Sequence, residues 1–450
     1  MTDANVVVVG GGIAGLTVAF DLARAGRRVL VLESADRPGG SVRRAEIAGV
    51  TVDIGAESYA TGPGTVDRLI DDLGLSAAVV RPRSTPAWVQ HAAGAAPLPG
   101  GGWLGVPSAS WATDVRRAIG WLGSARATLD YLLPRKHGRA ARTLGDLVRI
   151  RLGSRVLNRL VEPVVGGVYS TPPTAFGLDR LPATSRELLQ RSRSLMRGGR
   201  LIRSGSGAAG SHVAGLRGGI HTLVDALVTA IRAAGGRLQT GTPVDGLEQT
   251  DIGWVVRAGS AEWPADAVVL ACSAAGTQRL LGTAGSPDGG DVLLCTLVLD
   301  CPALDAAPRG SGVLVAAGTP GIAAKALTHA TAKWQWLAEQ AGPGRHVLRL
   351  SYGRIGDGIL PDHRAFPQLA INDASRLLGV ELRSDQLAGW ALTSWNVPGP
   401  VAAAPVVPSE RVRVTGGWVA GIGLAAVIGH ARQQAAALLE GAPPSGRMNE

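Results

Sequence analysis

The sequence predicts an α/β fold in which a parallel sheet, a sheet of mixed direction and an inserted helical domain share one chain. Three patterns support this prediction. Residues 6–32 read as a buried strand, a glycine-rich turn, a helix and a second buried strand, the order typical of a parallel sheet. Residues 103–205 read as largely helical and follow a stretch rich in proline and glycine. Strand-like runs return at 267–272, 291–315 and 346–352.

The first unit has the chemistry of a dinucleotide site. Gly10 permits a tight turn from strand to helix, and Gly12 has no side chain to keep a pyrophosphate from the backbone N–H groups. Gly15 lets the helix pack closely on the strand, and Glu33 ends the second strand, where a carboxylate accepts ribose hydroxyls. The unit predicts a Rossmann-type domain. A glycine-rich turn in an unrelated α/β protein is the alternative, and the unit alone does not separate FAD from NAD.

The composition is that of a globular chain with two or more domains. The chain has 450 residues, of which 46% are hydrophobic and 18% charged. Its formal net charge is +10, and the only lysines are Lys136, Lys325 and Lys333, so arginine carries the positive charge. An anionic substrate or an anionic membrane surface fits this balance, and a coding bias toward arginine explains it equally well. No basic run is interleaved with aromatic residues, so nucleic acid is a poor candidate partner.

Cysteine spacing and the N-terminal residues indicate the compartment. Cys272, Cys295 and Cys301 form neither a metal-binding pair nor a disulfide framework, so we expect a reducing, cytoplasmic compartment and no metal. The first twenty residues carry Asp3 and no basic leader, so we expect them to belong to the glycine-loop unit. No apolar stretch of about 20 residues is uninterrupted, which predicts no membrane span.

A second glycine loop makes the pattern more specific. Arg37-Pro38-Gly39-Gly40 follows Glu33, and Gly55-Ala56-Glu57-Ser58 follows a strand-like run. With the first unit, these segments resemble FAD-dependent amine oxidase-type flavoproteins. The resemblance implies FAD as cofactor and brings the backbone of 55–58 to the flavin. Ser41 stands where a basic residue is usual, and Arg43 and Arg44 are the candidates to replace it.

A segment of the helical block resembles a narrower group, the bacterial protoporphyrinogen and coproporphyrinogen oxidases. In that group a helix ends in Pro-x-x-x-Gly-Val-Tyr, which Pro163, Gly167, Val168 and Tyr169 match within residues 144–171. Proline interrupts a helix, and adjacent glycines let backbone approach a flat ligand. A plain helix terminator is the alternative. The candidate substrate residues are Gly166, Gly167 and Tyr169.

The same resemblance assigns FAD contacts further along the chain. It implies that the backbone of Val244 pairs with adenine and that Trp395 lies at the FAD edge. Residues 419–429 resemble the last FAD motif, read as a strand, a glycine-rich turn and a helix. The candidate cofactor residues are Gly10, Gly11, Gly12, Ile13, Ala14, Gly15, Glu33, Ser34, Gly40, Gly55, Ala56, Glu57, Ser58, Val244, Trp395, Ile422, Gly423 and Leu424.

The resemblance also implies a domain division. We expect a discontinuous FAD-binding domain at 1–85, 206–290 and 389–450, a mixed-sheet substrate-binding domain at 86–102 and 291–388, and a helical insertion at 103–205. Aromatic residues lie beside arginines in the insertion, which suits a membrane interface or an ordinary helical surface equally. The expected location is therefore cytoplasmic, with peripheral contact at the inner face of the membrane as the alternative.

The implied function is an FAD-dependent oxidase that converts a porphyrinogen, coproporphyrinogen III or protoporphyrinogen IX, to the porphyrin with dioxygen in heme biosynthesis. The flavin performs the redox chemistry, so we nominate no catalytic side chain and no metal ligand. Arg81, Arg83, Arg151 and Arg155 are the candidates to bind propionates of this anionic tetrapyrrole. A flavin amine oxidase or desaturase, and a non-catalytic tetrapyrrole-binding flavoprotein, are the alternatives. The second is suggested by departures from the family pattern at 397–405.

Overall fold

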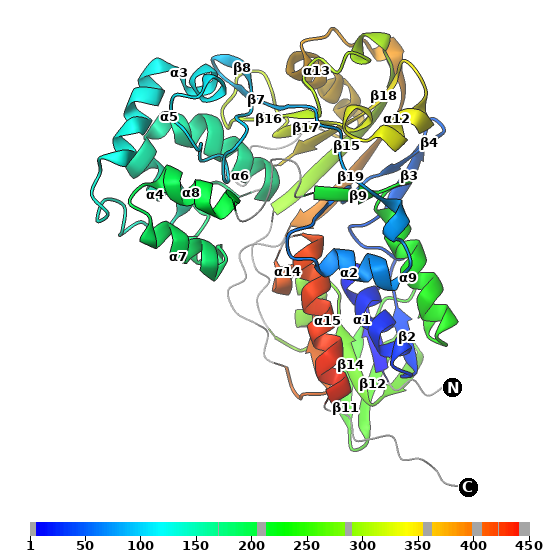
Figure 1. Ribbon diagram of the computed structural model, residues 1–450. Helices are drawn as coiled ribbons and strands as arrows, with labels where there is room; N and C mark the ends of the chain where they lie inside the picture. Colours follow the sequence, from blue (N-terminus) through cyan, green and yellow to red (C-terminus); the bar gives the residue numbers. More distant parts are fainter. Residues whose placement is uncertain are drawn as a thin grey trace.

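The computed structural model describes residues 6–169, 171–204, 213–283, 290–353, 362–397, 407–421 and 423–440. Figure 1 shows three bodies: a parallel sheet with its helices at the bottom, a mixed sheet at the upper right and a helical unit at the upper left. This arrangement confirms the predicted α/β class.

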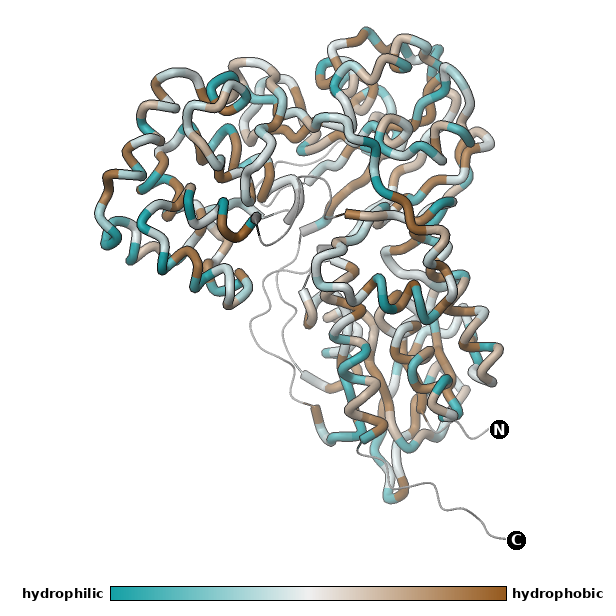
Figure 2. The backbone as a smooth tube through the Cα atoms, in the orientation of Figure 1, coloured by the Kyte–Doolittle hydropathy of each residue, from teal (hydrophilic) through white to brown (hydrophobic). Residues whose placement is uncertain are grey.

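The parallel sheet has five strands in the order β10-β2-β1-β14-β20. Helices α1, α9 and α15 pack on one face, and the three-stranded sheet β11-β12-β13 covers the other. Every residue of β1, β2 and β14 is therefore buried, as their unbroken apolar runs predict, and Figure 2 shows these strands as mainly hydrophobic. The bounds are β1 Val6–Val9, α1 Ile13–Arg24, β2 Val29–Leu32, α9 His221–Ala233, β10 Arg237–Gln239, β11 Gly246–Thr250, β12 Gly253–Ala258, β13 Ala261–Ala265, β14 Ala267–Leu270, β20 Val412–Val414 and α15 Leu424–Glu440.

The mixed sheet has seven strands in the order β19-β15-β18-β17-β16-β7-β8. β7 and β16 are parallel, and the other neighbours are antiparallel. α13 packs on one face of this sheet. The predicted boundary at residue 389, where the last segment of the FAD-binding domain was expected to begin, is wrong. β19 pairs with β15 over its length and therefore belongs to the mixed sheet. The bounds are β7 Ala87–His91, β8 Gly94–Pro97, β15 Gly290–Asp300, β16 Gly312–Val315, β17 Ala326–His329, β18 Arg345–Tyr352, α13 Phe366–Leu378 and β19 Leu387–Val397.

The helical unit lies within the predicted insertion. A wide π-turn at Leu157–Val161 precedes α6, and the chain stays helical through Pro163. The expectation that this proline interrupts the helix is therefore wrong: α6 continues for six residues beyond Pro163, and the wide turn lies just before the proline, where the regular hydrogen-bond ladder is already altered. The bounds are α3 Thr113–Thr128, α4 Leu144–Leu152, α5 Ser154–Val156, α6 Glu162–Tyr169, α7 Ala183–Arg191 and α8 Leu195–Ser204.

Smaller elements connect these bodies. The hairpin β3-β4 packs against the mixed sheet, and β5-β9-β6 lies between the two larger sheets. Val419 lies in the short helix α14 rather than in the expected strand, which β20 supplies five residues earlier. No helix in the described ranges is long and apolar enough to cross a bilayer. The remaining bounds are β3 Arg44–Ile47, β4 Val50–Asp53, β5 Tyr59–Ala60, α2 Thr65–Asp72, β6 Val79–Val80, β9 Val213–Leu216, α10 Ala274–Leu280, α11 Ala330–Lys333, α12 Gln335–Ala341 and α14 Gly417–Ala420.

Candidate functional site

The turn between β1 and α1 is shaped by its glycines. Gly10 has φ +106°, a conformation that side chains disfavour. A Cβ on Gly15 would lie 2.0 Å from the carbonyl oxygen of Gly10, so only glycine lets α1 start this close to β1. Ile13 and Ala14 are buried in the core beneath the turn. These contacts agree with the roles predicted for the loop.

Gly12 faces open space instead of protein. A Cβ there would have one neighbour within 4 Å, the Cα of Gly40 at 3.8 Å. Gly12 is also the N-cap of α1, with no side-chain cap and no acidic residue in the first turn. The first N–H groups of the helix are thus left to an external anion, as the pyrophosphate of a dinucleotide requires.

Glu33 closes the edge of this turn. Its Oε2 accepts a hydrogen bond of 2.6 Å from the Gly11 N–H, and its Oε1 accepts from the Ala35 N–H at 2.9 Å and the Ser34 hydroxyl at 3.2 Å. The Thr242 N–H donates to the Glu33 carbonyl at 2.8 Å, which brings the segment before Val244 alongside. Val244 packs against the apolar residues of the parallel sheet. Glycine turn, carboxylate and Val244 segment therefore meet at one end of the sheet and fit a dinucleotide.

A second loop leads from this turn toward the mixed sheet. The Gly39 N–H donates to the Gly11 carbonyl at 2.8 Å, and the Ala56 N–H donates to the Ser41 carbonyl at 3.0 Å. A Cβ on Gly55 would lie 2.0 Å from that Ser41 oxygen. The two predicted segments, 37–40 and 55–58, are thus joined through the backbone of Ser41. Ser58 is half-buried and leads into β5.

A cavity of about 270 Å³ lies where this loop meets the mixed sheet. One wall is the loop and the other is the surface of the sheet, so both larger bodies contribute. Its lining combines apolar side chains, three hydroxyls, an indole and one ion pair. The lining residues are Ser41, Gly55, Ala56, Glu57, Val292, Leu294, Ala326, Thr328, Arg349, Ser351 and Trp395. We call it the junction cavity.

Trp395 lines the junction cavity, and Arg43 contacts the Trp395 ring. The indole N–H of Trp395 donates to the Ile54 carbonyl at 3.3 Å, and the Arg43 guanidinium lies 4.9 Å from the centre of the Trp395 ring. Arg44 instead points outward to Asp225, at 3.3 Å. Of the two candidates to replace the basic residue missing at Ser41, Arg43 is thus the one at the site.

Two residues of the junction cavity lining, Glu57 and Arg349, belong to an ion cluster. Both carboxylate oxygens of Glu57 are engaged, one by Lys333 and the other by Arg349, and Arg349 also donates to the Gly55 carbonyl. Burial alone would raise the pKa of Glu57, but the two cations outweigh it and lower the pKa to about 2. The cluster therefore carries one surplus positive charge. The Nε of Arg349 is buried and has no hydrogen-bond partner within the described residues.

The sequence did not identify the two cations of this cluster. Lys333 is the last residue of α11, and Arg349 lies in the middle of β18, more than 270 positions from Glu57. Two signals were available: residues 328–334 resemble a family segment that contains Lys-Trp, and Arg349 lies within an apolar strand, where a charge must be paired.

The last FAD motif is described only in part. Gly423 has φ +109° and Leu424, which is buried, begins α15, which packs against α1. Ile422 lies outside the described residues. The turn before α15 therefore lies on the same face of the parallel sheet as α1.

The candidate substrate glycines lie apart from the junction cavity lining. A Cβ on Gly167 would meet the Cδ2 of Leu314 on β16 at 2.8 Å, and one on Gly166 would meet the Glu162 carboxylate at 3.1 Å. Glu162 in turn accepts from the Ala317 N–H at 2.7 Å, so α6 is fastened to the end of β16. The side chain of Tyr169 lies outside the described residues. Their substrate role stays a prediction.

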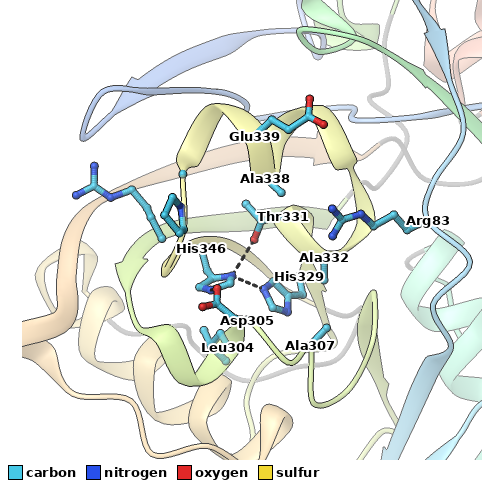
Figure 3. Close-up of a pocket in the computed structure, with 13 residues that line it drawn as sticks. Arg83, Leu304, Asp305, Ala307, His329, Thr331, Ala332, Ala338, Glu339 and His346 are labelled. Atoms are coloured by element: carbon cyan, nitrogen blue, oxygen red, sulfur yellow. Dashed lines mark hydrogen bonds and ion pairs between the residues drawn. The ribbon is translucent and has the colours of Figure 1, made fainter.

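A second cavity, of about 260 Å³, lies beside α12 and contains two buried histidines linked to the exposed Asp305 (Figure 3). The Nε2 of His346 is 3.0 Å from Asp305, and its Nδ1 is 3.0 Å from the Nε2 of His329. Burial, then the neighbouring His346, lowers the pKa of His329 to about 3. Arg83 lines this cavity, whereas Arg151 is buried in an ion pair with Asp130, so neither reaches the junction cavity.

The profile described as "Flavin containing amine oxidoreductase" matches residues 13–422. The chain belongs to this family. The predicted flavin cofactor and oxidoreductase class are thereby confirmed, and the glycine turn, Glu33 and the junction cavity are the parts that fit a flavin dinucleotide.

Individual relatives agree with this membership. The chain is 29% identical to "Coproporphyrinogen III oxidase" of Propionibacterium freudenreichii subsp. freudenreichii, over 97% of this chain and 91% of that relative. It is 30% identical to the protein of that name from Mycobacterium tuberculosis (strain ATCC 25618 / H37Rv), over 92% and 86%. A structure named "Putative protoporphyrinogen oxidase from Exiguobacterium sp. 255-15" superposes with a TM-score of 0.82 at 23% identity, covering 98% of this chain and all of the other. The last comparison confirms the fold.

Proposed function

We propose that the protein is an FAD-dependent oxidase that converts a porphyrinogen to the porphyrin with dioxygen as acceptor, in heme biosynthesis. Coproporphyrinogen III is the proposed substrate, with protoporphyrinogen IX second, because the curated relatives above carry the former name over nine-tenths of this chain. The structural support is the junction cavity, which adjoins both the loop from the dinucleotide turn and the mixed sheet.

Bound FAD supplies a two-electron acceptor that dioxygen regenerates. The chain's own residues bind and orient. Gly12 and the start of α1 receive the pyrophosphate, and Glu33 accepts the ribose hydroxyls. Val292, Leu294 and Ala326 give the junction cavity apolar walls, which limit water around the reacting groups. The surplus positive charge beside Glu57 favours an anionic ligand or negative charge that develops there.

Glu57 is unsuited to accept the protons that porphyrinogen oxidation releases. Lys333 and Arg349 hold its pKa at about 2, so it stays ionised near neutral pH. The other charged residue of the lining is Arg349, whose guanidinium group stays protonated and cannot accept a proton. We infer that the protons pass to water or between the substrate's own nitrogens, and that no side chain in the lining acts as a general base.

Anaerobic mixing of the flavoprotein with coproporphyrinogen III tests the proposal. We expect the flavin absorbance to bleach, and air to restore it with three molecules of peroxide formed per porphyrin. Protoporphyrinogen IX should bleach the flavin more slowly. Binding without bleaching would instead favour the non-catalytic alternative.

An amine oxidase is the second candidate. A putrescine oxidase bound to putrescine shares the fold with a TM-score of 0.67 at 15% identity, and cyclohexylamine oxidase from Brevibacterium oxydans IH-35A does so with 0.65 at 16%. Faster bleaching by putrescine or cyclohexylamine than by coproporphyrinogen III would select this candidate. The departures at 398–405 fall outside the described residues.

The domain roles and a peripheral membrane contact are also proposals. We assign FAD binding to the parallel sheet, substrate binding to the mixed sheet including β19, and surface contact to the helical unit. Trp121 is 66% exposed and Leu122 72%, and Arg116 lies 4.6 Å from the Trp121 ring, as suits an anionic interface. Sedimentation with anionic vesicles should fall for Trp121→Ser, but not for Ile252→Ser, which removes a side chain 93% exposed at the opposite end.

A further inference from the structure

The helical unit contains a third cavity, of about 680 Å³, that shares no lining residue with the junction cavity. It lies among α4, α7, the start of α8 and the loop that precedes α4. Its volume is in the range of sites for drug-sized ligands. Neither the flavin site nor the proposed substrate site requires it.

Leucines form the inner walls of this cavity. They come from α4, α7 and α8 and from the 3-10 turn before α7, and Leu181 and Leu195 are buried. The leucines are Leu147, Leu178, Leu181, Leu189 and Leu195. A ligand with an apolar body would bury its surface against them at about 25 cal/mol per Å².

The rim of the cavity is positively charged. Arg135, Arg139 and Arg186 are exposed and line it, against a single acidic residue, Asp179. The guanidinium groups of Arg139 and Arg186 make no hydrogen bond or ion pair with any described residue, whereas that of Arg135 donates to the Arg191 carbonyl at 3.0 Å. At least two guanidinium groups are thus available to an anion, and an arginine fork matches carboxylate or phosphate oxygens.

A buried ion pair holds the cavity walls in place. Arg151 pairs with Asp130 and also donates to the carbonyls of Pro134, His137 and Arg193, at 3.3, 3.0 and 2.6 Å. Asp130 in turn accepts from the Ser194 hydroxyl at 2.6 Å and the Met196 N–H at 3.0 Å. These bonds tie the loop before α4 to the start of α8. Two segments of the cavity lining are therefore fixed before any ligand arrives, which lowers the entropic cost of ordering them on binding.

We propose that this cavity binds an anionic amphiphile, a ligand with an apolar body and at least one carboxylate or phosphate group. Leucine walls exclude a purely ionic ligand, and the excess of arginine over acid excludes a cationic one. The chemistry is shared by long-chain acyl anions and by carboxylated tetrapyrroles. The proposal does not depend on the proposed oxidase function, because the two cavities are separate.

Isothermal titration of the flavoprotein with hexadecanoate and with coproporphyrin III tests this. At least one probe should bind with one-to-one stoichiometry, and hexadecan-1-ol should bind at least tenfold more weakly. Arg139→Gln with Arg186→Gln should weaken binding about ten- to a hundredfold, the effect of losing one charge-assisted hydrogen bond to the anion. The matched double variant Arg68→Gln with Arg411→Gln, which removes equal charge elsewhere, should bind like wild type.

A second variant locates the site. Leu189→Asp places a carboxylate in the wall and should abolish binding while leaving the flavin spectrum intact. Binding of hexadecanoate would identify the ligand as an acyl anion, and binding of coproporphyrin III would identify it as a tetrapyrrole. Equal binding of the alcohol, unchanged affinity in the arginine pair, unchanged affinity in Leu189→Asp or binding of neither probe overturns the proposal. Porphyrinogen turnover, measured in parallel, reports separately on the oxidase function.

Discussion

Replacing Glu57 by glutamine tests whether the ion cluster joins the two larger bodies of the protein. The carboxylate side chain is 14% exposed, and its partners Lys333 and Arg349 are 18% and 7% exposed, so solvent does little to screen the cluster. Its pKa is lowered from 4.5 to about 2, which at 1.36 kcal/mol per pH unit corresponds to about 3 kcal/mol of stability at neutral pH. Glutamine keeps the shape and leaves two buried cations without their anion.

We expect urea unfolding at pH 7 to show that Glu57→Gln lowers the free energy of unfolding by about 3 kcal/mol. The exposed control Glu46→Gln should lower it by less than about 0.5 kcal/mol. Because the folded pKa is depressed, the contribution is complete above pH 4.5 and is lost as the pH falls toward 2. The difference between wild type and Glu57→Gln should therefore hold from pH 7 to 5 and shrink below 4.5. A loss equal to that of Glu46→Gln would refute the reasoning.

Three further variants probe other features. Gly12→Val should fold but purify without FAD, because the valine side chain enters the space that the pyrophosphate would occupy. Gly62→Val, whose side chain also enters open space, should keep FAD. If both variants kept FAD, the proposed role of the Gly12 loop would be contradicted. Gly167→Leu should keep the flavin spectrum but lower porphyrinogen turnover on the order of a hundredfold, because the new side chain displaces Leu314 on β16. Gly100→Leu, in open space, should leave turnover unchanged. Unchanged turnover in Gly167→Leu would show that α6 is not part of the substrate site. Burial lowers the pKa of His329 from 6.5 to about 3, so the folded state holds this side chain neutral while the unfolded chain takes up a proton below pH 6.5. The free energy of unfolding should therefore fall by about 2 kcal/mol between pH 7 and pH 5. His329→Leu should flatten that acid dependence in urea unfolding, and an unaltered slope would count against the assignment.

The dinucleotide site was predictable because its chemistry is local. Gly10, Gly12, Gly15 and Glu33 lie within one strand–turn–helix–strand unit, whose spacing alone fixes their relation in space. The structure adds the hydrogen bond from Gly11 to Glu33, which spacing does not reveal.

The junction cavity was only half predictable. Residues 55–58 and Trp395 were identified by resemblance, but Lys333 and Arg349 reach Glu57 through sheet pairing that no local pattern encodes. The turn before α6 shows a similar limit. Pro163 suggested a helix break, yet the chain stays helical through the π-turn and α6, and the contact of Gly167 with Leu314 on β16 joins residues that no local pattern relates.

The order of strands in the parallel sheet also has a consequence for synthesis of the chain. β1 lies between β2 and β14, and ten of the twelve residues of α1 are buried, many of them against α15. α15 begins at Leu424, so about 400 residues must be translated after α1 before its cover exists. At a translation rate of roughly 5–20 residues per second, the face of α1 that packs on α15 stays uncovered for about 20–80 s while the chain is still on the ribosome. The dinucleotide turn therefore emerges first and is completed last: α9 can cover part of α1 about halfway through synthesis, but the face that packs on α15 stays exposed until the end of translation.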